Sequence, residues 1–132
     1  MAERVHFTGY LNAPEKAFGL MDIYAVSSDT EQMPNALIQA MAAARPVAGM
    51  DVGDVAHIVA RENRPFIAAA GSDEAFQSCL NRLASDVALR TQAGTANLAR
   101  VRAEFDQDRM FEVYRTLFDG ETPAQSRADI AA

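Results

Sequence analysis

Four short apolar runs, separated by segments with helical patterns, constrain the fold of this chain more than any other feature. Each run carries β-branched or aromatic residues and ends near Gly, Ser, Asp or Pro, as buried strands do. The predicted strands are Val5–Gly9, Asp22–Ser27, Pro46–Met50 and Pro65–Ala69. Strands that are apolar throughout and joined through helices favour a parallel sheet with right-handed crossovers. The sequence therefore predicts an α/β fold with a parallel sheet of about four strands.

Helical patterns lie between these runs and occupy the whole second half of the chain. The predicted helices between the strands are Pro14–Met21, Asn35–Ala44 and Val55–Arg61. Ser72 is a predicted N-cap, and a long arginine-rich helix is predicted over Leu89–Phe105. Asp106 or Asp108 is predicted to cap a last helix. The inner face of that helix is expected to carry Met110, Val113, Tyr114 and Leu117. We expect one domain over residues 1–119 and a disordered polar tail over residues 120–132.

Composition and charge exclude several classes of protein. A chain of 132 residues that is 49% hydrophobic and 23% charged fits one globular domain. Its formal net charge is -6, and its twelve basic residues are scattered, so no nucleic-acid partner is expected. The single cysteine, Cys79, cannot form an internal disulfide, and the first residues lack a signal-peptide pattern. No apolar run approaches the roughly 20 residues of a membrane span. These features predict a cytoplasmic protein.

The segment after the second predicted strand carries the most chemical information. A polar loop follows Ser27, and a helix is predicted to begin at Pro34 or Asn35, because proline suits a first helical turn and asparagine is a common cap. Unpaired N–H groups of Asn35, Ala36 and Leu37 would then face the carboxyl edge of the sheet, where α/β folds bind anions. Glu31 precedes this helix and Gln39 lies in its second turn. Two polar side chains are therefore expected to flank a phosphate-sized site.

This segment reads Glu31-Gln-Met-Pro-Asn-Ala-Leu-Ile-Gln39-Ala-Met-Ala-Ala, and Arg45-Pro-Val and Asp51-Val-Gly follow it. This segment resembles the donor-binding half of family 4 glycosyltransferases. Further agreement comes from Val5–Gly9, the Asp22-Ile-Tyr and Pro-Phe-Ile strands and the Arg-Val-Arg-Ala-Glu-Phe helix. Their signature is Glu, seven residues, Glu, and then Ala-Met-Ala. The resemblance covers about residues 4–118. It implies part of a GT-B fold, in which two Rossmann-like domains face each other, and hence a partial Rossmann-like sheet here.

The resemblance also implies a role for each matching position. Glu31 matches the glutamate that reaches the hydroxyls of the transferred sugar, so it is the expected catalytic residue. Gln39 matches the glutamate that usually holds the ribose hydroxyls. The other implied donor-binding positions are Met33, Pro34, Asn35, Ala36 and Leu37 at the sugar or diphosphate, and Gly9 and Tyr10 at the nucleobase. Family members transfer a sugar from a nucleoside diphosphate sugar with retention, and they generally need no metal or other cofactor.

Two departures from the family pattern leave alternatives open. Gln39 replaces a glutamate, and an amide binds hydroxyls without the strength of a charged carboxylate. The sequence before Val5 lacks two strands, a helix and an Arg/Lys loop of the family's donor domain, and no acceptor domain is visible. We therefore expect a missing N-terminal half or a homo-oligomer to cover the open strand edge. The resemblance implies a glycosyltransferase of glycan or polysaccharide synthesis whose isolated chain is inactive; the alternative is a non-catalytic scaffold.

The segment Asp51–Asp54 follows the third predicted strand and allows two interpretations. It could bind a ligand at the carboxyl end of that strand. It could equally serve to turn the chain before the next helix.

Overall fold

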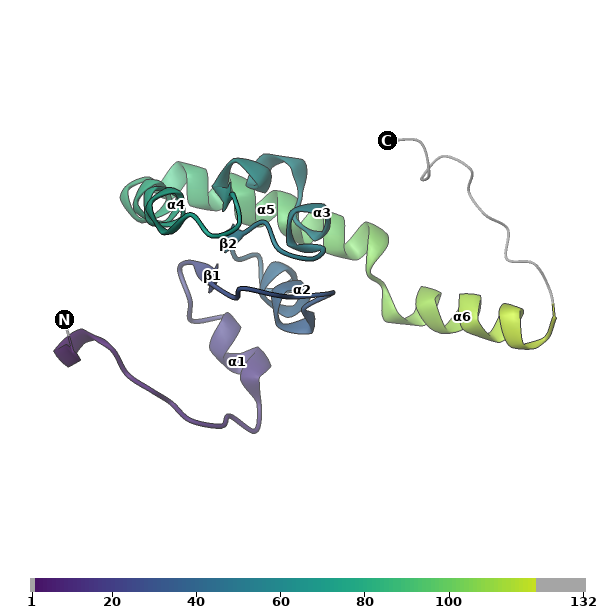
Figure 1. The fold of residues 1–132 in the computed structure, drawn as a ribbon. Helices are drawn as coiled ribbons and strands as arrows, with labels where there is room; N and C mark the ends of the chain where they lie inside the picture. Colours follow the sequence, from purple (N-terminus) through teal and green to yellow (C-terminus); the bar gives the residue numbers. More distant parts are fainter. Residues whose placement is uncertain (1, 121–132) are drawn as a thin grey trace.

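The computed structural model describes residues 2–120 and, within that range, places a three-stranded parallel sheet at the centre of an α/β fold (Figure 1). The strands are β1 (Tyr24–Val26), β2 (Val47–Met50) and β3 (Ile67–Ala68), in the order β1-β2-β3. In their register, Ala25 lies opposite Ala48, and Met50 lies opposite Ala68. The predicted class and the parallel sheet are confirmed.

The helices begin close to the predicted positions. They are α1 (Pro14–Phe18), α2 (Asn35–Ala42), α3 (Val55–Ile58), α4 (Asp73–Ser85), α5 (Val87–Glu104) and α6 (Gln107–Phe118), with short 3-10 helices η1 (Ala2–Arg4) and η2 (Arg61–Phe66). The Ser72 hydroxyl accepts a hydrogen bond from the Ala75 N–H at 3.4 Å, and the Asp106 carboxylate accepts one from the Arg109 N–H at 2.9 Å. Ser72 is therefore the predicted N-cap of α4, and of the two predicted candidates for α6, Asp106 and Asp108, it is Asp106 that caps the helix.

The predicted first strand, Val5–Gly9, is wrong. The segment runs as irregular chain outside the sheet, and the Val5 and Phe7 side chains are 55% and 96% exposed. Strand formation depends on a neighbouring strand that can supply hydrogen bonds, and an apolar run alone does not provide one. The sheet of the described residues therefore has three strands instead of about four.

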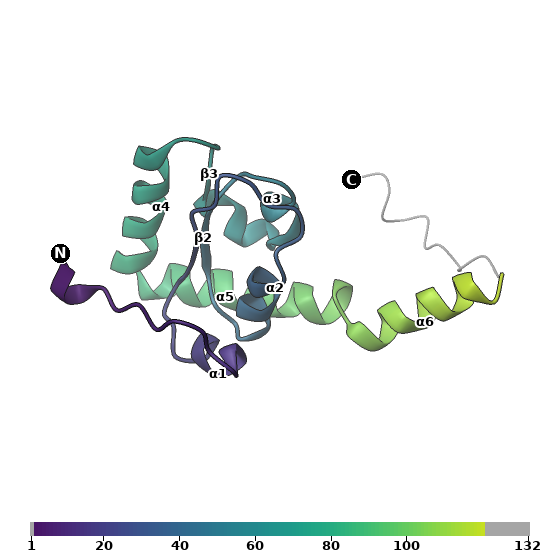
Figure 2. The same cartoon turned by 60° about the horizontal axis from the view of Figure 1, so that its bottom comes forward.

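Helices cover both faces of the sheet. One core lies on the side of α2 and α3 and includes Val26, Leu37, Met41, Val47 and Val55. A second core lies on the side of α4 and includes Ala48, Phe66, Ala68, Cys79 and Leu83. Figure 2 shows α4 on one side of the strands, α2 and α3 on the other, and α5 running across their amino ends. Every residue of β2 is buried, as expected for the middle strand of such a sandwich.

A buried pair of asparagines completes the sheet at the amino end of β2. The Asn63 amide accepts a hydrogen bond from the Val47 N–H and donates one to the Val47 carbonyl, both at 2.8 Å. The Asn97 amide of α5 donates to Asn63 at 2.9 Å and to the Arg45 carbonyl at 3.0 Å, and it accepts a bond from the Ala60 N–H at 3.0 Å. β1 lies beside Val47 on one side, but on the other side the pairing with β3 begins only at Gly49. There the Asn63 side chain satisfies the N–H and carbonyl groups of Val47 in place of a strand.

The last helix does not pack as the sequence predicts. α6 projects away from the body (Figures 1 and 2), and the side chains of its expected inner face are 41–53% exposed. An amphipathic pattern shows which face of a helix favours an apolar contact, but it does not supply the contact. The predicted disordered tail lies outside the described residues from position 121 onward. Among residues 2–120, no helix is long and apolar enough to cross a membrane.

Candidate donor site

The N-terminus of α2 lies at the carboxyl edge of the sheet, just after β1 and its loop. Pro34 is the N-cap residue, in an extended conformation with φ -70° and ψ 110°, and its carbonyl accepts hydrogen bonds from Leu37 and Ile38 at 3.0 and 3.4 Å. The prediction of an unpaired Leu37 N–H is therefore wrong, because the first turn closes on that group. The N–H groups of Asn35 and Ala36 have no partner among the described residues and remain available to an anion.

Glu31 lies on the loop that enters α2. Its half-buried carboxylate accepts a hydrogen bond from the Ser28 hydroxyl at 2.7 Å, which limits the directions in which it can point. Burial raises the pKa of the Tyr24 phenol, and the negative charge of Glu31 raises it further. The Glu31 carboxylate is therefore close enough to the phenol of Tyr24, the first residue of β1, for its charge to act on it. Around it, Thr30, Glu31, Gln32 and Met33 line an open hollow of about 540 Å³.

A second loop, which follows β2, lies directly against the Glu31 loop. Gly53 has a φ of +53°, and a Cβ atom at this position would overlap the carbonyl group of Glu31. Beside it, the Asp54 N–H donates to the Gln32 carbonyl at 2.9 Å. Asp54 also occupies the N-cap position of α3, but its side chain makes no capping bond. The segment Asp51–Asp54 thus turns the chain before α3 and packs against the candidate site, a contact that the sequence analysis missed.

Gln39 is the predicted ribose-binding residue, and it lies on the exposed side of α2. Gln39 is exposed and lies four residues after Asn35, so the two share one side of the helix. Leu37 is fully buried in the core, and only its backbone lies near the mouth of the helix. Met33, just before Pro34, is 51% exposed. The residues from 31 to 36 therefore form one continuous surface around the N-terminus of α2.

Gly9 and Tyr10 are not part of this surface. Gly9 has a φ of +64°, no atom lies within 4 Å of the place where a Cβ would stand, and the Tyr10 side chain is 91% exposed. The segment that holds them precedes α1 and runs outside the body of the fold, on the far side of α1 from the sheet (Figure 1), whereas the mouth of α2 lies at the carboxyl ends of the strands. The structure thus groups the predicted sugar and diphosphate positions and leaves the two predicted nucleobase positions apart from them.

The charges around the mouth are acidic. The two adjoining loops, residues 27–34 and 51–54, contain Asp29, Glu31, Asp51 and Asp54 and no lysine or arginine. Arg45 follows α2 at the opposite end, where its guanidinium donates to the Met21 carbonyl at 2.6 Å. Nowhere in residues 2–120 do three His, Cys, Asp or Glu side chains gather as metal ligands would. An anion at this mouth would therefore be held by backbone N–H groups and the helix dipole.

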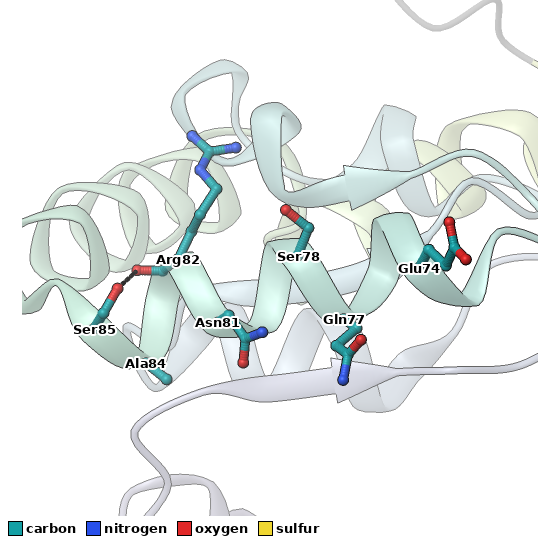
Figure 3. A pocket seen from close by; sticks show the side chains of 7 residues that line it. All are labelled: Glu74, Gln77, Ser78, Asn81, Arg82, Ala84 and Ser85. Carbon is teal, nitrogen blue, oxygen red and sulfur yellow. Dashed lines mark hydrogen bonds between the residues drawn. The ribbon is translucent and has the colours of Figure 1, made fainter.

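A larger hollow, of about 710 Å³, runs along the outer face of α4 and has no connection to this site. Its lining, shown in Figure 3, consists of Glu74, Gln77, Ser78, Asn81, Arg82, Ala84 and Ser85. Figure 3 shows Arg82 on the side of α4 opposite Gln77 and Asn81, where its guanidinium donates to the Pro65 carbonyl at 3.1 Å and lies 4.8 Å from the Phe66 ring centroid. A single helix supplies every lining residue of this hollow, and a single loop supplies those of the hollow at Glu31; the Glu31 loop also contacts the loop after β2 through the bond from the Asp54 N–H to the Gln32 carbonyl.

Comparisons with known proteins agree with this arrangement. A family model described as glycosyl transferases group 1 matches residues 1–86. The chain belongs to this family. No curated protein matches the chain. Among solved structures, the chain is similar to sucrose-phosphate synthase from Thermosynechococcus elongatus, with 25% identity and a TM-score of 0.79. The match covers 90% of this chain and 31% of that chain, so this chain spans about a third of the length of its structural neighbour.

Proposed function

We propose that this chain is the donor-binding part of a retaining glycosyltransferase, which takes a sugar from a nucleoside diphosphate sugar. One observation carries the proposal: in a chain of this family, a glutamate lies on the loop that enters a helix at the carboxyl edge of a parallel sheet, three residues before the N-cap of that helix. That edge is where open α/β sheets bind their ligands, and a helix N-terminus favours a diphosphate. The family match and the likeness to sucrose-phosphate synthase support the same activity.

Each residue of the proposed site has a distinct task. The free N–H groups of Asn35 and Ala36 bind the diphosphate and stabilise it as a leaving group. The Glu31 carboxylate accepts hydrogen bonds from the sugar hydroxyls and orients the sugar, while its charge favours the positive charge that develops on the ring. The Gln39 amide binds the ribose hydroxyls, for which it has both a donor and an acceptor. This proposal requires no metal and no other cofactor.

The acidic loops limit how tightly the chain alone can hold a diphosphate. The two adjoining loops contain four acidic residues and no cation to offset them. We therefore expect a dissociation constant on the order of 1 mM, which corresponds to about 4 kcal/mol of binding free energy. Turnover would require the remainder of a longer enzyme, in keeping with the length of the structural neighbour. The acceptor belongs to that remainder, and the proposed setting is cytoplasmic glycan or polysaccharide synthesis.

Phosphorus NMR with uridine, guanosine and adenosine diphosphates, and with their glucose conjugates, tests the proposal. At least one pair should show saturable line broadening at millimolar concentration. Glu31→Gln should weaken binding of the sugar conjugate, because a charged acceptor is lost, and should strengthen binding of the bare diphosphate, because a repulsive charge is removed. The control, Glu62→Gln, changes an exposed glutamate of η2 and should alter neither. Absence of binding by every pair would contradict the proposal.

A non-catalytic scaffold is the alternative function. It requires assembly without affinity for nucleotides, and the same titrations with light scattering would detect it. No contact among the described residues favours it over donor binding.

A further inference from the structure

The Glu31 loop depends on contacts from outside itself. It is polar, five of its seven residues between 27 and 33 are exposed, and the Ser28–Glu31 hydrogen bond holds a side chain and not the backbone. The backbone bond that joins the loop to another element comes from Asp54, which donates to the Gln32 carbonyl at 2.9 Å. A loop with so little burial stays in place only where such neighbours fix it.

Gly53 makes that contact possible. Its φ of +53° lies in the left-handed region that favours glycine, and the space where a Cβ would stand is filled by the Glu31 carbonyl. The obstructing atoms belong to the backbone, so no change of side-chain rotamer can remove the overlap. Any side chain at position 53 must therefore push the Glu31 peptide and the loop after β2 apart, which changes the place of the Glu31 carboxylate relative to that loop.

We propose that Gly53 is a positioning residue for Glu31, which sets the distance between the carboxylate and the mouth of α2 by allowing the loop after β2 to lie against the Glu31 backbone. The Asp54 N–H fixes the adjacent peptide in the same place. This inference rests on the proposed donor site, because it concerns the residue that would orient the sugar. A displacement of about 1 Å at such a group can lower a reaction rate by a factor of about 100.

Gly53→Ala, compared with Gly71→Ala, tests this role in the full chain without any ligand. Gly71 also has a positive φ, +74°, but a Cβ there would meet no atom within 4 Å, so this control has the backbone strain without the contact. In Gly53→Ala, the amide NMR signals of Gln32 and Met33 should shift, and the pKa of Tyr24 should change because the charge of Glu31 moves. Gly71→Ala should leave both unchanged. A folded Gly53→Ala variant with unchanged signals and an unchanged Tyr24 titration would overturn the proposal.

Hydrogen exchange on the unaltered protein covers the case in which Gly53→Ala does not fold. The Asp54 amide should exchange at least about tenfold more slowly than the neighbouring Gly53 amide, because its hydrogen bond to Gln32 must open first. Equal exchange at the two positions would overturn the inference. A wild-type chain that binds no nucleoside diphosphate would remove the proposed function and leave the Gly53 contact in place, so the two failures are distinguishable.

Discussion

Replacement of Asn63 by alanine should reveal how strongly the buried asparagine pair stabilises the fold. The Asn63 side chain is fully buried and makes three hydrogen bonds at 2.8–2.9 Å. Asn63→Ala leaves three buried groups without partners: the Val47 N–H, the Val47 carbonyl and one Asn97 N–H. Each such group costs about 1–3 kcal/mol, so we expect a loss of about 3–5 kcal/mol after some relaxation. A domain of this size has roughly 5–15 kcal/mol of stability in total.

Urea unfolding followed by circular dichroism measures this loss directly. The expected loss corresponds to a melting temperature lower by very roughly 15 °C. Asn81→Ala is the matched control, because Asn81 is an exposed asparagine on α4 and its removal should change stability by less than about 0.5 kcal/mol. A loss below about 1 kcal/mol for Asn63→Ala would refute the argument that its amide takes the place of a strand beside Val47.

Three further predictions concern other parts of the fold, and a fourth concerns assembly. Gly94→Ala should lower the free energy of unfolding by about 1–3 kcal/mol, because a Cβ there would overlap the Ala44 carbonyl and force α5 away from the loop before β2. The control, Gly19→Ala, should be nearly neutral, and thermal unfolding compares the two variants. The raised pKa of Tyr24 means that the folded chain keeps a proton that the unfolded chain loses, so the unfolding free energy should fall above about pH 10 and stay unaffected by this group below it. Glu31→Gln should lower the pKa of Tyr24, as followed by ultraviolet titration, and an unchanged titration would contradict their proximity. Light scattering at micromolar concentration should detect a homodimer, and a compact monomer would refute that expectation.

Much of the fold follows from local sequence signals. Ser72 and Asp106 cap helices because their short polar side chains reach the first free N–H groups. The strand before Ser27 and the helix after Pro34 are found where an apolar run and a proline predict them. The family resemblance is confirmed as well, because the family model matches residues 1–86, which include the motif around Glu31. These features depend on residues that are close in the sequence.

The features that the sequence analysis missed depend on distant contacts. Val5–Gly9 has strand-forming residues but no neighbouring strand, and the apolar face of α6 meets no partner among residues 2–120. The bond between Asn97 and Asn63 joins residues 34 positions apart, and nothing in the local pattern of either residue indicates it. Gly53 could have been suspected from the Asp-Val-Gly-Asp turn, but its contact with Glu31 required the structure.

Amide NMR of the chain during titration with the nucleoside diphosphate sugar that binds best tests the central claim most directly. The largest shifts should fall on Asn35 and Ala36, whose N–H groups have no partner among the described residues, and sugar protons should show nuclear Overhauser contacts to the loop of residues 30–33. Shifts confined to another surface, such as the outer face of α4, with no contact to the Glu31 loop, would contradict the account.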